Sequence, residues 1–227
     1  MPTNLDLFHV TADVTGVSKD EIDQIALYLK REGMMPVGVR GRNSPRATVT
    51  SLDAARLLLA LYIGPPWTQV PSKVRRVGAF RSNELARLQL TDIQLPFPQM
   101  FVTGVLFIDF IAHVLDNGDI YFNHVEENAK FICDLANNEG AFRDDPDNLP
   151  PPGEELIPNL ISTLGIYSDH QHIWGSANLC LDADRYSRAV MTFTAPDAPE
   201  YLGSGGLITE KYISDVRLKM IADLFRQ

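Results

Sequence analysis

Apolar residues recur at helical spacing twice within the first 32 residues of the chain. Leu5, Phe8 and Ala12 predict the buried side of a first helix, because residues three or four apart share one helix face. A second helix is expected from Ser18 to Glu32. Its apolar stripe comprises four residues, Ile22, Ile25, Ala26 and Leu29. The pattern therefore predicts two amphipathic helices at the start of the chain.

The segment between these helices has the spacing of a tight turn. Ala12 is small enough to let two helices approach, and Gly16 can adopt a positive φ. Ser18 is the expected N-cap, with Glu21 completing a capping box, and Gly33 is the expected C-terminal stop. Two helices that cross at such a turn form a helix-turn-helix, whose second helix normally enters the DNA major groove.

The string from Ala12 to Ile22, with Gly16, Val17 and Ser18 at its centre, carries a family resemblance. It resembles the A-x-x-x-G-V-S-x-x-x-I pattern of bacterial and phage helix-turn-helix proteins. The resemblance covers roughly the first third of the chain and implies a DNA-binding role for the second helix.

The outer side of that helix carries the first candidate DNA contacts. We expect five polar residues to project away from the core: Ser18, Lys19, Asp20, Asp23 and Gln24. Gln24 can pair bidentately with adenine, and Lys19 can reach guanine or phosphate. Asp20 and Asp23 oppose a polyanion, although acids there also stabilise the positive end of a helix. A helix-turn-helix used only for protein contacts is therefore an open alternative.

A basic segment follows the second helix. Two β-prone runs, Val37 to Val39 and Ala47 to Thr50, flank a turn rich in Gly, Asn, Ser and Pro that contains no acid. We interpret it as the β-hairpin wing of a winged helix, aimed at phosphate or a minor groove. An ordinary solvated loop is the alternative. The candidate contacts are Arg40, Arg42, Asn43 and Arg46.

Two further helical patterns complete the N-terminal part. Ser51 to Tyr62 is apolar on most faces and is followed by Gly64, Pro65 and Pro66, which predicts a core helix. A second pattern runs from Pro71 to Leu90. Its cations either extend the phosphate-binding surface or form a solvated face: Lys73, Arg75, Arg76, Arg81 and Arg87.

The prolines at Leu95 to Pro98 mark an expected boundary between a winged helix-turn-helix domain at 1–94 and an acidic domain at 95–227. A helical hairpin is expected from Gln99 to Asp116 and from Ile120 to Leu135, and residues 139–159 are expected to form a loop. Two strands of a small sheet are expected at residues 173–181 and 189–194, and a terminal amphipathic helix at residues 207–225. The predicted class is α+β, mostly α.

The charge is divided unevenly along the chain. Residues 1–90 hold 12 Lys and Arg against 8 Asp and Glu, whereas residues 91–227 hold 8 against 21, within a net charge of −9. The net balance is therefore +4 for the first part and −13 for the second. This asymmetry predicts a DNA-touching N-terminal part and an acidic part for oligomerisation or a protein partner.

No motif in the chain favours catalysis. Cys133 and Cys180 lie far apart, and His170 and His172 lack a third ligand at a recognised spacing. A P-loop and a nucleophile elbow are both missing. We therefore predict no enzyme activity, no cofactor and no metal. Asp6 and Asp13 oppose a secretion signal, and the apolar run at residues 100–115 is too short for a membrane span, so we expect a cytoplasmic protein.

Three functions compete on this basis. The first is a winged helix-turn-helix transcriptional regulator that binds double-stranded DNA as a homo-oligomer. The second is a phage-type small terminase subunit, since such packaging proteins are similar in plan, with an N-terminal helix-turn-helix, a ring-forming helical hairpin and a motor-binding C-terminus. The third is a protein-interaction module without DNA binding.

Overall fold

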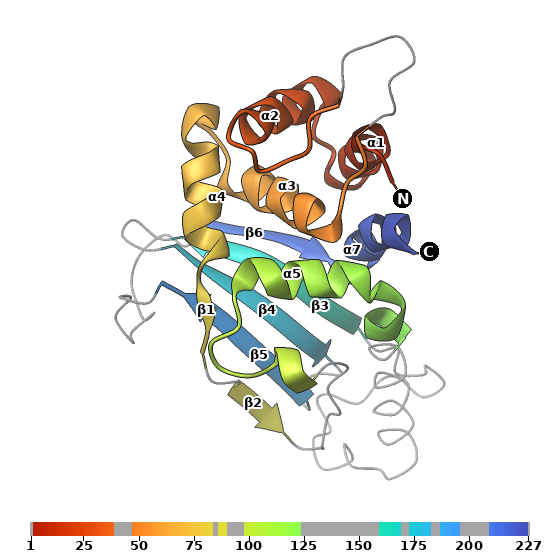
Figure 1. The fold of residues 1–227 in the computed structure, drawn as a ribbon. Coiled ribbons are helices and arrows are strands. Elements are labelled where there is room, and N and C mark those ends of the chain that lie inside the picture. Colours follow the sequence, from red (N-terminus) through yellow and green to blue (C-terminus); the bar gives the residue numbers. More distant parts are fainter. Residues whose placement is uncertain are drawn as a thin grey trace.

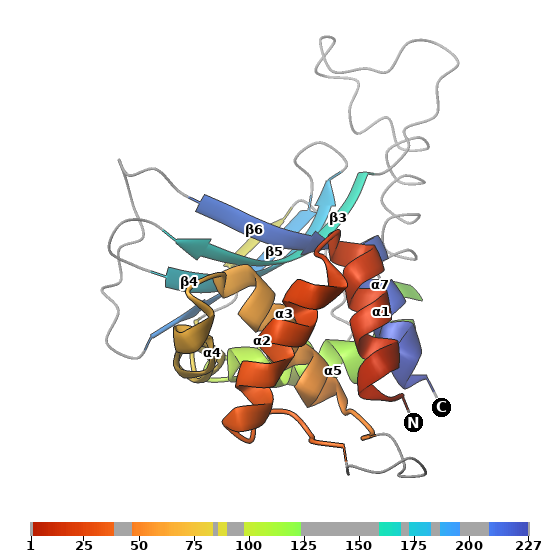
Figure 2. The same ribbon diagram turned by 90° about the horizontal axis from the view of Figure 1, so that it is seen from above.

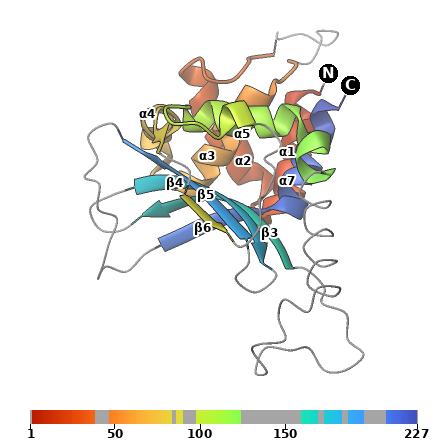
Figure 3. The same ribbon diagram turned by 90° about the horizontal axis from the view of Figure 1, so that it is seen from below.

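Helices lie against one face of an antiparallel β-sheet in the computed structural model (Figures 1 and 3). The two layers place the protein in the α+β class, as predicted, and helices hold more of the described residues than strands do. The structure describes residues 2–38, 47–83, 86–89, 98–123, 159–168, 173–182, 187–195 and 209–226.

Four helices from the first 78 residues form one end of the helix layer (Figure 1). Helix α3 is buried along most of its length and contacts α2 and α4, which makes it the centre of this group. The predicted second and third helices are confirmed to within one residue at each end. The elements are α1 (Asn4–Thr15), α2 (Lys19–Arg31), α3 (Ser51–Ile63), the 3-10 helix η1 (Trp67–Gln69) and α4 (Val70–Gly78).

Helix α1 is confirmed, but its buried side differs from the predicted one. Leu5 is 42% exposed, and Ala12 is only half-buried. The side chains that α1 buries are Leu7, Phe8, Thr11 and Val14. The difference arises because α1 packs against α7 (Asp215–Ala222), an element from the far end of the chain that local spacing does not reveal (Figure 2).

The turn between α1 and α2 has the predicted geometry. Gly16 has φ 73°, and its N–H donates to the Ala12 carbonyl at 2.9 Å, which closes the last turn of α1. A Cβ added at Gly16 would meet nothing within 4 Å, so the position demands glycine for its backbone conformation and not for space.

We therefore expect Gly16→Val to lower the free energy of unfolding by about 1–2 kcal/mol, the cost of a left-handed conformation for a branched residue. Gly16→Asn should lower it less, since Asn tolerates this conformation. Urea unfolding of the three proteins measures the difference. Equal losses for the valine and asparagine variants would contradict this explanation.

Two helices begin with complete capping boxes. At α1, the Thr3 N–H donates to Asp6 Oδ2 at 2.9 Å, and the Asp6 N–H donates to Thr3 Oγ1 at 3.4 Å. Thr50 and Asp53 repeat the arrangement at α3, with distances of 2.9 and 3.3 Å. Thr50 is thus the N-cap of the third helix.

The helical pattern expected from Pro71 to Leu90 is wrong in its second half. Helix α4 ends at Gly78, and the chain then forms two short strands, β1 (Arg81–Ser82) and β2 (Ala86–Gln89). Arg87 and Leu88 therefore lie on a strand. Both strands pair with β5 (Ser187–Thr194), whose backbone supplies hydrogen bonds that outweigh the local helical spacing.

The sheet has six antiparallel strands in the order β1-β5-β4-β3-β6, with β2 also beside β5. The two strands expected near residues 173–194 are confirmed and pair with each other, with Ala177 opposite Met191. The sequence pattern missed the other four strands. The confirmed strands are β4 (Ile173–Asp182) and β5 (Ser187–Thr194), and the missed ones are β1, β2, β3 (Asn159–Ser168) and β6 (Thr209–Ser214).

The terminal amphipathic helix expected from Leu207 to Phe225 is a strand followed by a shorter helix. Strand β6 pairs with β3 through Thr209–Ser214, so Tyr212 and Ile213 lie on the sheet edge. Helix α7 (Asp215–Ala222) and the 3-10 helix η4 (Asp223–Phe225) follow. Leu218 and Ile221 are buried, whereas Met220 is 48% exposed. The apolar residues of this stretch fit both the alternating pattern of a strand and the spacing of a helix. Pairing with β3 makes its first part a strand.

The first helix of the expected hairpin is shorter than predicted. The 3-10 helix η2 (Pro98–Met100) precedes an irregular segment, and α5 spans Phe107–Asp116. Helical residues 118–123 follow the predicted turn at Asn117, and the rest of the expected second helix lies outside the described residues, as does most of the 139–159 loop. A Cβ at Gly118 would lie 2.6 Å from the Ala222 Cβ, so glycine allows α7 to pack closely here.

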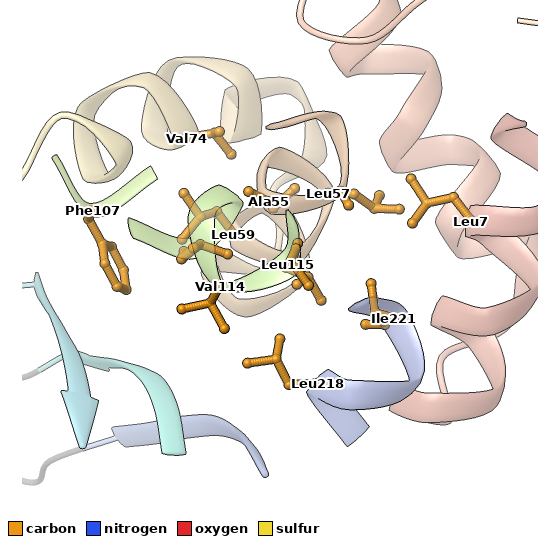
Figure 4. Packing of buried hydrophobic residues seen from close by; sticks show 14 of the residues in the cluster. Leu7, Ala55, Leu57, Leu59, Val74, Phe107, Val114, Leu115, Leu218 and Ile221 are labelled. Carbon is orange, nitrogen blue, oxygen red and sulfur yellow. The ribbon is translucent and has the colours of Figure 1, made fainter. Parts of the chain in front are cut away.

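One buried cluster joins elements from both sides of residue 95. Figure 4 shows side chains from α1, α3, α4, α5 and α7 pointing toward one another, including Leu7, Leu57 and Ile221. A backbone hydrogen bond also links the two parts of the chain, because the Asn83 N–H donates to the Thr192 carbonyl at 2.8 Å. The N-terminal helices therefore pack on the acidic part of the chain.

Candidate nucleic-acid interface

Helix α2 presents a polar face to solvent and a fully buried face to the core. Ile22, Ile25, Ala26 and Leu29 are each 0% exposed, which confirms the predicted stripe. The opposite face is fixed outward because the buried stripe allows no rotation of the helix. Ser18, Lys19, Asp20, Asp23 and Gln24 are all exposed, as the spacing predicts.

Ser18 has a structural role at the start of this helix. Its Oγ accepts from the Glu21 N–H at 3.3 Å, which satisfies one of the free N–H groups at the helix start. Among the described contacts, this hydrogen bond is the half of the predicted capping box that forms. The hydroxyl proton of Ser18 is still available for a phosphate, whereas Lys19 and Gln24 are not used in capping.

Charge changes sign along α2. Its first turn carries Asp20 and Glu21, and its last turn carries Lys30 and Arg31. This arrangement complements the helix dipole, which supports a structural role for Asp20. The first two turns, residues 18–24, thus hold three acids against the single cation Lys19.

Aromatic rings position both cations of the last turn. The Lys30 Nζ lies 5.0 Å from the centroid of the Phe8 ring, and the Arg31 guanidinium lies 5.6 Å from that of Tyr28. Burial lowers the pKa of Lys30 from its ordinary value, and the charge of Asp23 partly opposes this shift. Arg31 is exposed, so it is the cation of this turn that faces solvent most fully.

The predicted wing is not paired as a hairpin at its described ends. Thr48 forms an antiparallel bridge with Thr3, and the Ala47 carbonyl accepts from the Asn4 N–H at 3.1 Å. The run from Ala47 to Thr50 thus pairs with the residues before α1, whose backbone groups need partners, and residues 36–38 form no strand. Arg40, Arg42, Asn43 and Arg46 lie outside the described residues.

The flanks of this arginine segment lie at the end of α1 that is remote from Lys19. Asn4 Nδ2 donates to the Pro36 carbonyl at 3.2 Å, which places Pro36 beside the start of α1. Lys19 follows the end of α1, and a helix of 12 residues is about 18 Å long. The described residues therefore bring the segment's flanks to the C-terminal end of α2, not to its first two turns (Figure 2).

Helix α4 adds a second polar face beside that end. Val70, Val74 and Val77 are at most 1% exposed, so the opposite side of α4 faces solvent. Arg75 and Arg76 are exposed and Lys73 is half-buried. Arg75 Nη2 contacts Glu32 Oε2 at 3.0 Å and the Glu32 carbonyl at 3.1 Å, which joins α4 to the end of α2. These α4 cations were not among the main candidates from the sequence. The absence of acids from residues 54–83 is the signal that singles them out.

A pocket of about 260 Å³ opens behind α4. Its apolar lining includes Met34, Val74 and Ile108, and two arginines lie at its wall. Arg56 Nη1 donates to the Met34 carbonyl at 2.9 Å and to Asp53 Oδ1 at 3.4 Å, while Arg75 pairs with Glu32. Both guanidinium groups are thus balanced by carboxylates of the chain, and this pocket carries no unpaired cation to hold an anion.

A metal-binding cluster and a membrane-spanning helix are both absent from the described residues. These residues contain no group of three His, Cys, Asp or Glu side chains that could hold a metal ion. No helix of the described part has the length and apolar character that a bilayer crossing requires. The histidine pair at residues 170 and 172 lies outside the described residues.

Comparison with known proteins does not assign a family. No family model, no curated protein and no solved structure matches the chain significantly. The exposed faces of α2 and α4 are therefore the features that bear on function.

Proposed function

We propose that the N-terminal helices bind double-stranded DNA and that the protein is a transcriptional regulator of helix-turn-helix type. One observation carries the proposal: α2 follows a glycine turn, buries its apolar side completely and exposes its polar side. An α-helix with its side chains is about 10–12 Å across, which fits the major groove of about 12 Å.

Each candidate residue on α2 has a distinct role in this proposal. Gln24 lies on the second turn and is exposed, so its amide supplies a donor and an acceptor for adenine. Lys19 reaches guanine or phosphate from the first turn. Contacts to the phosphate backbone are assigned to the cations of the arginine segment, Arg40, Arg42 and Arg46, together with Asn43.

A second candidate function is a contact with another protein through the same face. Leu27 lies on the outer side of α2 and is 46% exposed, and Asp20 and Asp23 lie on the turns before it. An exposed aliphatic residue among acids suits a protein surface better than a phosphate backbone. This function becomes the preferred one if the protein does not bind DNA.

The test is binding of the full chain to DNA. We expect the wild-type protein to select a preferred duplex from a random pool and to lose affinity as salt rises. Gln24→Ala should weaken binding to the selected duplex by about 10- to 100-fold, because one bidentate base contact contributes about 1–3 kcal/mol of discrimination. Fluorescence anisotropy measures both affinities.

Arg217→Gln is the matched control, since it removes one exposed cation from α7, a helix to which no DNA contact is assigned. It should bind the selected duplex as the wild type does. A wild-type protein that retains no duplex at about 50 mM salt would overturn the proposal. Light scattering adds the oligomeric state, and a ring of many subunits would favour DNA packaging over regulation.

A further inference from the structure

We propose that α4 and the last turn of α2 form a second contact with the same DNA, made to its phosphate backbone. This cationic face consists of Arg31, Lys73, Arg75 and Arg76. The inference rests on the proposed function and assigns it a surface that is separate from the base-reading turns.

Three of the four cations, Lys73, Arg75 and Arg76, lie in an acid-poor segment of the chain. Between Glu32 and Glu84 the chain has eight Lys and Arg residues and one acid, Asp53, within a protein of net charge −9. Asp53 is 7% exposed and is engaged by Thr50 and Arg56, so it adds little negative charge to the surface. An acidic protein that concentrates its cations in one segment presents a localised site for a polyanion.

The fold displays these cations together. The three valines of α4 are packed in the core, which directs Arg76 and Arg75 outward. The ion pair between Arg75 and Glu32 joins the exposed side of α4 to the turn that carries Arg31. Arg31 and Arg76 are exposed and have no carboxylate partner among the described residues, so their charges are available to a phosphate.

The need for such a contact follows from the sign of charge at the start of α2. Residues 18–24 carry three acids and one cation, which by itself repels a duplex. Phosphate contacts supply most of the affinity of DNA-binding proteins, and base contacts supply the specificity. The cationic face offsets the repulsion at the first turns of α2 and sets the orientation of that helix on the duplex.

The test compares salt dependence in two variants. Lys73→Gln/Arg76→Gln removes two cations and leaves Arg75 in place, because Glu32 pairs with Arg75. We expect the slope of log affinity against log salt to become shallower by about 2, roughly 0.9 for each phosphate contact. Affinity for any duplex at about 0.1 M salt should fall roughly 10- to 100-fold. Arg76→Gln alone, at an exposed position, should give about half the change in slope.

Arg217→Gln is again the control and should retain the wild-type slope. Gln24→Ala should lose sequence preference while keeping that slope, which separates the two surfaces. If Lys73→Gln/Arg76→Gln binds with the wild-type slope and affinity, the cationic face is only a solvated surface and the inference is overturned, although the proposed function stands. If the wild-type protein binds no DNA, the proposed function fails as well. Circular dichroism of each variant verifies that the helices are intact.

Discussion

Phe193→Ala is expected to lower the free energy of unfolding by about 3–5 kcal/mol and to destabilise both layers at once. Phe193 lies on β5 and is 0% exposed. Its ring centroid lies 4.6 Å from that of Phe107 and 5.5 Å from that of Phe110, both on α5. Truncation to alanine therefore leaves a cavity between the sheet and the helix that contacts α3 and α4.

Urea unfolding followed at 222 nm measures this loss, because the signal comes mainly from helices. We expect one transition, shifted as a whole to lower urea, since α1 to α4 share the buried cluster with α5 and β5. Met220→Ala is the control, at a side chain that is 48% exposed, and should change stability by less than about 0.5 kcal/mol. If part of the helical signal stayed at the wild-type midpoint, the N-terminal helices would fold independently of the rest, as a domain boundary at residue 95 implies.

Asp53→Ala is expected to have the second largest effect, about 2–4 kcal/mol. Asp53 Oδ2 accepts from the Thr50 N–H and the Thr50 hydroxyl, at 2.9 and 2.8 Å, and Oδ1 accepts from Arg56. Alanine removes the Asp53 half of the capping box, which costs about 1 kcal/mol. It also leaves the Thr50 N–H and the half-buried Arg56 guanidinium short of a partner, at about 1–3 kcal/mol more.

The capping box at α1 offers a matched comparison. Asp6 makes the same bonds to Thr3, but these contacts are exposed to water. Asp6→Ala should therefore cost about 1 kcal/mol or less, because water replaces the lost bonds. Asp53→Asn keeps an acceptor oxygen and should be less harmful than Asp53→Ala. Equal unfolding free energies for Asp6→Ala and Asp53→Ala would show that burial at α3 does not matter.

The sequence predicted those features that depend only on residues close together in the chain, such as a turn, a helix cap or the buried face of one helix. The αL turn at Gly16, the cap at Ser18 and the four buried residues of α2 follow from spacing within about 15 residues. The outward position of Lys19 and Gln24 follows in turn, because a buried stripe determines the opposite face. The pairing of β4 with β5 was accessible for a similar reason, since the two strands are separated by a short connection.

Contacts between distant segments decided the rest. Strands β1 and β2 form where helical spacing continues, because β5, about 100 residues later, provides their hydrogen bonds. Strand β6 replaces half of a predicted helix because β3 provides its pairing partner. Packing against α7 places Leu7 and Val14 on the buried side of α1. The pairing of Arg75 with Glu32, which places α4 beside the end of α2, is a tertiary contact too.

The sequence by itself determined the amphipathic helix pair at the N-terminus, its exposed polar residues and the separation of charge along the chain. Only the tertiary structure decided that these helices pack on an antiparallel sheet from the acidic part. It also decided that the exposed cations of α4 lie beside the end of α2 that is opposite to its acids. Helix faces and caps depend on neighbours a few residues apart, which the sequence displays directly. Sheet pairing and the meeting of α2 with α4 depend on chain segments that only folding brings together.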